Sequence, residues 1–173
     1  VTDAIAVFET TLVTADSPFD DYLRGDEAAI TAEQKSGYEI FKSAGCVRCH
    51  FGPALGGASF ERMGVAADYF QARGGEIQDV DHGRFNVTRD DGDRHAFKVP
   101  VLRNVAVTYP YFHDASTDDL GEAVRIMGRH QVGRELDDEE IRLVVLFLES
   151  LTGVYQGVPV DQITAEMRGT ASP

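Results

Sequence analysis

The sequence predicts an all-α domain whose helices are joined by long loops, and three observations lead to this prediction. Apolar residues recur at intervals of three and four in several segments, which is typical of helices with one buried face. Residues 51–97 are rich in glycine and charge and keep no sustained period, which indicates loops and short turns. A chain of 173 residues with 43% apolar residues is long enough for one ordinary globular domain.

The first predicted helix covers residues 3–13. Ala4, Val7, Phe8 and Leu12 stand at helical spacing behind an Asp3 cap, and Pro18 closes the segment. We interpret residues 1–30 as an arm helix followed by a linker.

A second helix is predicted from about residue 32. Thr31 and Gln34 form a capping box ahead of Tyr38 and Phe41, and the helix should run on to a pair of cysteines at Cys46 and Cys49. The cysteine pair therefore lies at the carboxyl end of this helix.

Two further helices are predicted in the C-terminal half. One begins after residues 116–119 and places Leu120, Ala123, Val124 and Met127 on one inward face. The other opens at residues 137–140 and stops at Gly153. Its predicted buried residues are Leu143, Val144, Phe147, Leu148 and Leu151. The expected domain therefore covers residues 31–153, with a tail over 154–173.

The chain is acidic, with 29 acidic against 16 basic residues and a net charge of −13. This balance repels nucleic acid and anionic membranes and attracts basic partners, or it simply solvates the surface. No run approaches the roughly 18 to 20 apolar residues of a membrane span, and no signal peptide opens the chain. We therefore expect a soluble protein whose export signal is already gone.

Only two cysteines are present, two residues apart, and four interpretations compete for them. A zinc site needs about four ligands and usually a second Cys/His pair at suitable spacing. A thioredoxin-like redox pair expects a βαβ context. A disulfide would close so small a loop that it would constrain the unfolded chain little. The fourth interpretation also explains the histidine that follows the pair.

The segment Cys46-Val47-Arg48-Cys49-His50 has the C-x-x-C-H form of covalent c-type haem attachment. Two thiols on one short turn meet the two vinyl groups of the porphyrin, and the next residue turns its imidazole to the iron as the proximal ligand. Because haem is attached in this way outside the cytoplasmic membrane, we expect a periplasmic or otherwise exported protein. Electron transfer is the function that such a haem predicts.

The ligand on the other face of the iron decides the chemistry, and Met127 is the first candidate. It lies 77 residues after His50 on the apolar face of a capped helix, although a methionine that merely fills the core is the usual alternative. His113 is the second candidate. The remaining candidates are less suitable. Met63 is too close to His50 in the sequence, and Met167 lies in the tail. His82 and His95 lie in polar loops and are expected to be solvated surface histidines, and His130 should point to another side of its helix.

Several motifs in order resemble the C-terminal haem domain of the bacterial di-haem cytochrome c peroxidases. Residues 97–114 read FKVPVLRNVAVTYPYFHD and are followed by Ile126-Met127-Gly128 and Gln131-Val132-Gly133. Residues 17–20, 22–25, 81–85 and 147–153 fit the same pattern. The resemblance covers nearly the whole chain and implies a cytochrome c-like fold wrapped around one covalent haem.

The resemblance also implies roles for single residues. Cys46 and Cys49 would form the thioethers, and His50 and Met127 would ligate the iron of a haem that takes electrons from a small cytochrome c or cupredoxin. Arg103 would lie near a haem propionate. The backbone carbonyls of Thr108 and Pro110 would reach a calcium ion at a domain junction. A related branch that matures methylamine dehydrogenase has tyrosine at the position of Met127, so the methionine favours the peroxidase branch.

This sequence carries one haem motif, whereas the family has a second, N-terminal haem domain that reduces hydrogen peroxide to water. We expect either a piece of a longer protein with a second haem domain or a natural single-haem relative. Two rival functions remain: a single-haem peroxidase with a labile methionine ligand, and a haem-based gas sensor. A homodimer is also compatible with the sequence.

Overall fold

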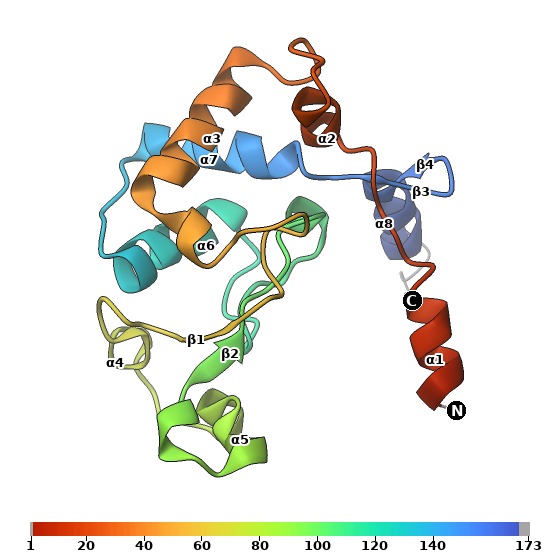
Figure 1. Ribbon diagram of the computed structural model, residues 1–173. Helices are drawn as coiled ribbons and strands as arrows, with labels where there is room; N and C mark the ends of the chain where they lie inside the picture. Colours follow the sequence, from red (N-terminus) through yellow and green to blue (C-terminus); the bar gives the residue numbers. More distant parts are fainter. Residues whose placement is uncertain (1, 170–173) are drawn as a thin grey trace.

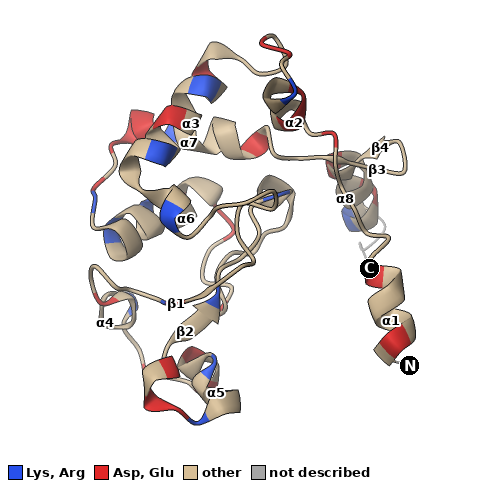
Figure 2. Cartoon of the chain, in the orientation of Figure 1, with Lys and Arg blue, Asp and Glu red and all other residues tan. Residues whose placement is uncertain are grey.

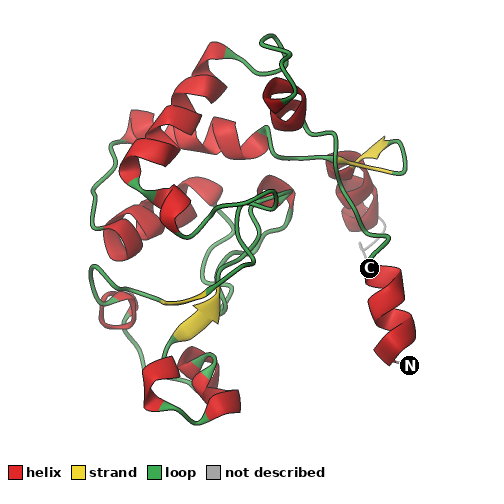
Figure 3. Ribbon diagram, in the orientation of Figure 1, coloured by secondary structure: helices red, strands yellow, loops and turns green. Residues whose placement is uncertain are grey.

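The computed structural model describes residues 2–169, and helices dominate this part of the chain (Figures 1 and 3). The α-helices are α1 (Thr2–Glu9), α2 (Pro18–Leu23), α3 (Ala32–Ala44), α4 (Tyr69–Arg73), α5 (Phe85–Thr88), α6 (Leu120–Met127), α7 (Asp138–Glu149) and α8 (Val160–Gly169). The short turns are the 3-10 turns η1 (Cys46–Arg48), η2 (Asp79–His82), η3 (Asp91–Asp93) and η4 (Val105–Val107) and the π-helical turn η5 (Gly128–Val132). The strands β1 (Phe60–Arg62) and β2 (Ala96–Lys98) form one antiparallel sheet, and β3 (Val154–Tyr155) and β4 (Val158–Pro159) form another.

The prediction of a helical fold with long connections is right in the main. The sequence does not predict the two small sheets, because strands of two and three residues are too short to show an alternating pattern. Among the described residues, no helix combines the length and the apolar character that a membrane crossing requires.

The main core lies between α3 and α7, which cross in the upper part of Figure 1. Phe147 is completely buried, and its ring lies 5.1 Å from the ring of Phe19, 5.1 Å from that of Tyr38 and 5.2 Å from that of Phe41. We call this group the Phe147 cluster; its buried members are Phe19, Ile30, Phe41, Leu55, Leu102, Val144, Phe147, Leu148 and Leu151. It joins residues from both ends of the chain.

The two central helices begin as predicted. Thr31 and Gln34 form the reciprocal capping box of α3, and Asp137 and Glu140 form that of α7. Two details of the α7 prediction are wrong. The helix ends at Glu149 rather than at Gly153, and Leu143 is only half-buried; its backbone carbonyl lies against Gly37 of α3.

The close approach of α3 to α7 depends on Gly37. A Cβ atom at this position would lie 1.9 Å from the carbonyl oxygen of Leu143 and 3.0 Å from Cβ of Phe147. Backbone atoms cannot yield as the end of a flexible side chain does, so a methyl group here would separate the two helices.

Gly37→Ala is therefore expected to destabilise the protein. Overpacking a well-filled interior typically lowers the free energy of unfolding by about 1–3 kcal/mol. Because the added methyl group would meet a backbone carbonyl, we expect a loss at the upper end of this range. Chemical denaturation measures the change in the free energy of unfolding. Ser36→Ala is the control, because this exposed neighbour lies on the same helix; equal stability of the two variants would contradict the close approach.

The N-terminal arm differs from its prediction. Helix α1 ends at Glu9 rather than at residue 13, and Asp3 lies inside its first turn instead of capping it. Its apolar side chains are exposed; Val7 is 67% and Phe8 59% accessible. Pro18 does not close a helix but begins α2, where the buried Ser17 forms a capping box with Asp20.

The glycine-rich segment after His50 contains β1, β2 and short helical turns rather than loops alone. Around α4 it builds a second apolar group, which we call the Met63 cluster. Its buried members are Met63, Tyr69 and Phe70, and Phe97, Phe112, Ile126 and Met127 pack against them. In Figure 1 these elements lie below the α3 and α7 pair.

The segment expected as a tail instead contains β3, β4 and α8. Asn104 ties it to the arm: its side chain donates to the hydroxyl of Thr14 at 2.8 Å and accepts from the backbone of Gly153 at 2.9 Å. The backbone of Val154 also donates to the carbonyl of Ala15 at 2.9 Å. Residues near both ends are thereby held together, a long-range pairing that local sequence patterns do not reveal.

Candidate haem site

The two cysteines and His50 share one tight turn directly after α3. Gly45 ends the helix in the left-handed region, with φ at 98°, and η1 follows at once. The backbone N–H groups of Cys49 and His50 both donate to the carbonyl of Cys46, at 3.3 and 3.0 Å. This turn presents two free thiols and an imidazole from one short piece of backbone, as covalent haem attachment requires.

Burial keeps both thiols protonated. It raises the pKa of Cys46 to about 11 and also raises that of Cys49. Redox-active and metal-binding cysteines depend on a lowered pKa and a thiolate. The raised pKa values do not favour a thioredoxin-like pair, and the cysteines follow a helix rather than a strand. The group of three possible metal ligands found among the described residues is Asp81, His113 and Asp114, which does not include the cysteines.

His50 is half-buried, with one ring nitrogen engaged by the backbone. Its Nδ1 lies 3.3 Å from the carbonyl oxygen of Leu55, to which it donates when it carries the proton. Burial lowers the pKa of His50 and so favours the neutral ring. A neutral histidine with Nδ1–H bonded to a carbonyl offers Nε2 as the metal-binding nitrogen. The donor set therefore fits haem c, with Cys46 and Cys49 as thioether residues and His50 as an iron ligand.

Arg103 lies beside His50 but is already paired. Both residues line a cavity of about 260 Å³, together with Phe19, Leu23, Tyr38, Phe41, Val47, Phe51, Gly52, Pro53 and Leu55. The Arg103 guanidinium donates to the two carboxylate oxygens of Asp20 at 2.7 and 2.6 Å, and its Nε donates to the carbonyl of Pro53 at 2.8 Å. Its predicted role near a haem propionate stays a prediction; the contacts show that it anchors α2 to the loop after His50.

Met127 is the last residue of α6 and is followed directly by the π-helical turn η5. Such turns are rare and occur frequently at functional sites. Met127 packs against the Met63 cluster, whereas His50 lies beside Phe41, a member of the Phe147 cluster, at 6.4 Å between ring centres. The contacts thus place the two predicted ligands in different apolar groups.

The other candidate ligands are held by the protein. His113, the second candidate, donates a hydrogen bond from its Nε2 to the Asp81 carboxylate at 2.7 Å, and its ring stacks on Phe97 at 4.3 Å. This contact engages the nitrogen that would otherwise reach an iron. Met63 is buried in its cluster, and Met167 is 67% exposed on α8.

The interpretation of His82 and His95 as solvated surface residues is wrong, because both are half-buried. The Nδ1 of His95 lies 2.7 Å from the carbonyl oxygen of Asp81, and its ring packs on Phe70 at 4.4 Å. The Nδ1 of His82 is buried and has no hydrogen-bond partner among the described residues. His130 is buried, with Nδ1 3.1 Å from the carbonyl of Ala67.

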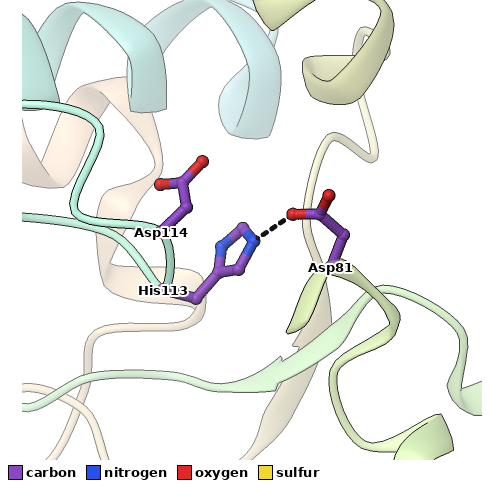
Figure 4. Close-up of side chains that lie close together, drawn as sticks. All are labelled: Asp81, His113 and Asp114. Carbon is purple, nitrogen blue, oxygen red and sulfur yellow. Dashed lines mark hydrogen bonds and ion pairs between the residues drawn. The ribbon is translucent and has the colours of Figure 1, made fainter. Parts of the chain in front are cut away.

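A buried ionic network lies next to these histidines, and the sequence does not predict it. Asp81 is 1% exposed and pairs with Arg73 through both carboxylate oxygens, each at 2.8 Å. Arg73 also donates to Asp114 at 2.8 Å. Figure 4 shows the His113 ring directed at Asp81, with Asp114 next to it in the chain. Asp81, His113 and Asp114 come close enough to hold a cation, but the Arg73 guanidinium supplies the positive charge here.

This network is expected to make stability sensitive to acid. Hydrogen bonding from Arg73 holds the pKa of Asp81 well below its usual 3.8. The resulting stabilisation is complete above the unfolded-state pKa and is lost as the pH falls towards the lower folded-state value. We expect the free energy of unfolding to decline between about pH 4 and pH 2, and Asp81→Asn to make that decline less steep. Denaturation curves recorded across this pH range measure the free energy of unfolding of both proteins. The same dependence on pH in the wild type and in Asp81→Asn would contradict the ion pair.

Thr108 and Pro110, the predicted calcium ligands, lie on an exposed segment after η4. The guanidinium of Arg168 lies 3.7 Å from the ring of Tyr109 between them and donates to the carbonyl of Val107 at 2.8 Å. The positive charge of Arg168 weakens the attraction of this segment for a calcium ion. Calcium binding by Thr108 and Pro110 therefore stays a prediction.

Proteins named as cytochrome c peroxidases are similar to this chain in sequence. No family model matches the sequence. The chain is 54% identical over 155 residues to "Cytochrome c peroxidase Ccp" of Escherichia coli, covering 90% of this chain and 33% of that protein. It is 48% identical over 153 residues to "Cytochrome c551 peroxidase" of Nitrosomonas europaea, covering 88% of this chain and 44% of that protein.

A solved structure of similar fold agrees with these relatives. The crystal structure of a MauG-like protein associated with microbial copper homeostasis superposes with a TM-score of 0.65 and 27% identity, covering 80% of this chain and 52% of that one. The chain thus spans less than half the length of the two peroxidases. These names support the expectation of a c-type haem. The homologues of this chain are bacterial cytochrome c peroxidases and MauG-like proteins.

Proposed function

We propose that this chain is a c-type cytochrome domain that carries single electrons, as the electron-entry half of a di-haem cytochrome c peroxidase. The observation that carries the proposal is the turn of Cys46, Cys49 and His50, with neutral thiols and an Nδ1 directed at a carbonyl. The similarity to two peroxidases over about nine tenths of the chain supports it.

The chain's own residues would hold the cofactor as follows. Cys46 and Cys49, at the end of α3, would form the thioethers to the haem; His50 would be one iron ligand through Nε2, and Met127, at the end of α6, would be the other through its thioether. Bound haem supplies one-electron chemistry, and a His/Met ligand pair favours a higher potential than two histidines. The protein supplies burial and ligand orientation, with α3 and α7 fixing the His50 side and the Met63 cluster supporting Met127.

The proposal extends to partners and location. A whole protein of this class would contain a second haem domain that reduces hydrogen peroxide to water, and would receive electrons from a small cytochrome c or cupredoxin in the periplasm. Figure 2 marks acidic residues in red on most of the labelled helices, and the net charge of −13 would speed encounter with a basic donor. Haem attachment through thioethers is itself the reason to propose export.

Ligand access tests the proposal against its two rivals. We expect the reduced chain to show no spectral change with carbon monoxide and the ferric chain to form no ferryl species with peroxide, because Met127 closes the distal face. Stopped-flow absorption measures both. Rapid ferryl formation would support a single-haem peroxidase instead, and carbon monoxide binding at comparable speed would support a gas sensor.

A further inference from the structure

Asp81 joins four separate segments of the chain. Its carboxylate accepts hydrogen bonds from Arg73 at the end of α4, from the backbone of Gln78 at 2.8 Å and from His113 at 2.7 Å. Its backbone carbonyl lies 2.7 Å from Nδ1 of His95, just before β2. One buried residue thereby fixes α4, the turn η2, the approach to β2 and the segment at His113.

Three of these segments, α4, β2 and the segment next to His113, contribute Tyr69, Phe70, Phe97 and Phe112 to the Met63 cluster. Phe70 lies on α4 and packs against the ring of His95 at 4.4 Å. Phe97, from β2, stacks on His113 at 4.3 Å. Tyr69 donates its hydroxyl to Asp114 at 3.3 Å. Tyr69, Phe70 and Phe97, three aromatic residues of the cluster against which Met127 packs, are therefore each held through a neighbour by the network that centres on Asp81.

Removal of the Asp81 carboxylate would take away the acceptor of the His113 Nε2 and would leave Arg73 with Asp114 as its remaining carboxylate partner. Arg73 is 20% and His113 14% exposed at the side chain, so water cannot replace the lost acceptor freely. Loss of one carboxylate from a buried ionic network is unfavourable, because Arg73 keeps one of its two carboxylate partners and His113 loses its hydrogen bond. The segments would move apart to reach water, and they would take the aromatic rings beside Met127 with them.

We propose that Asp81 is a positioning residue for Met127. It holds the Met63 cluster in the one arrangement that presents the Met127 thioether to the iron. The inference rests on the proposed function, in which Met127 is the second iron ligand. It assigns no metal to Asp81, because both carboxylate oxygens are bonded to Arg73.

The test compares Asp81→Asn with Asp91→Asn in the haem-loaded chain. Asp91 is the matched control, since its side chain is 83% exposed and its ion pair with Arg94 lies on the surface. The readouts are the weak near-infrared band of methionine-ligated ferric haem, the midpoint potential and the thermal unfolding temperature. We expect Asp81→Asn to keep its covalent haem but to lose at least half of the band amplitude and to lower the potential, and Asp91→Asn to change neither.

Two further variants keep the outcome decisive. Arg73→Lys retains the positive charge but not the paired hydrogen bonds, so it should lower the band in the same direction by a smaller amount, even if Asp81→Asn folds poorly. Met127→Ala defines the spectrum without methionine. If the wild-type spectrum equals that of Met127→Ala, the proposed ligation fails and the inference with it. If the wild type shows the band and Asp81→Asn shows it undiminished, whatever its stability, only the inference is overturned.

Discussion

Replacement of both Cys46 and Cys49 by alanine is expected to abolish covalent haem completely. The chain contains two cysteines, so no other thiol can form a thioether. Without these bonds the haem would be held by coordination and burial alone and would be extracted by acidified acetone or lost on a denaturing gel. Haem staining of the gel and the absorption of the extracted protein measure the effect.

Single variants separate the two thiols. Cys46→Ala and Cys49→Ala would each keep one thioether and therefore retain stain. Cys46 packs against the apolar groups around α3, whereas Cys49 is less buried, so the loss of Cys46 should reduce stability more. Covalent haem in the double variant, or none in the wild type produced with a working attachment system, would contradict the assignment of the motif.

The second large effect is expected from Met127→Ala. Loss of a thioether ligand removes the near-infrared band and lowers the potential, and axial ligands tune haem potentials over a range of about 0.8 V, so a drop on the order of 0.1 V or more is expected. The open coordination position should then bind carbon monoxide and react with peroxide. Spectroelectrochemistry and stopped-flow absorption measure these changes.

Met63→Ala is the matched control, because Met63 is the other methionine of the same cluster and is 9% exposed. It should destabilise the protein, since removal of a buried methionine typically costs about 2–5 kcal/mol. The band should be weaker because the cluster that positions Met127 is loosened, but it should not be abolished as in Met127→Ala. The reverse result, with the band lost in Met63→Ala and kept in Met127→Ala, would exchange the roles of the two residues.

The helices that carry the proximal side are predictable from the sequence for physical reasons. Thr31 and Asp137 start α3 and α7 through capping boxes, and such caps are local signals. The turn of Cys46, Cys49 and His50 is local too. Because each of these features depends on residues within a few positions of one another, the sequence alone specifies them.

The distal side is less predictable because its contacts are distant in sequence. Asp81 pairs with Arg73, which is close in sequence, but its hydrogen bond with His113 joins residues 32 positions apart. The hydrogen bond between Asn104 and Thr14 joins residues 90 positions apart. His95 appears in a charged segment and so suggests a surface residue, yet Asp81 and Phe70 bury half of it. No local period marks such pairs; only the folded chain brings them together.

The separation of the two clusters has a consequence for how this kind of domain can vary. The core helices α3 and α7 are joined by roughly ninety residues of chain, and most of the Met63 cluster belongs to that insertion. The entropy of closing a long loop changes slowly, by about 0.6 kcal/mol for each doubling of its length. Residues could therefore be gained, lost or exchanged on the distal side with little penalty to the scaffold that carries His50. Natural selection could in this way change the reactivity of the iron while leaving the means of holding it untouched.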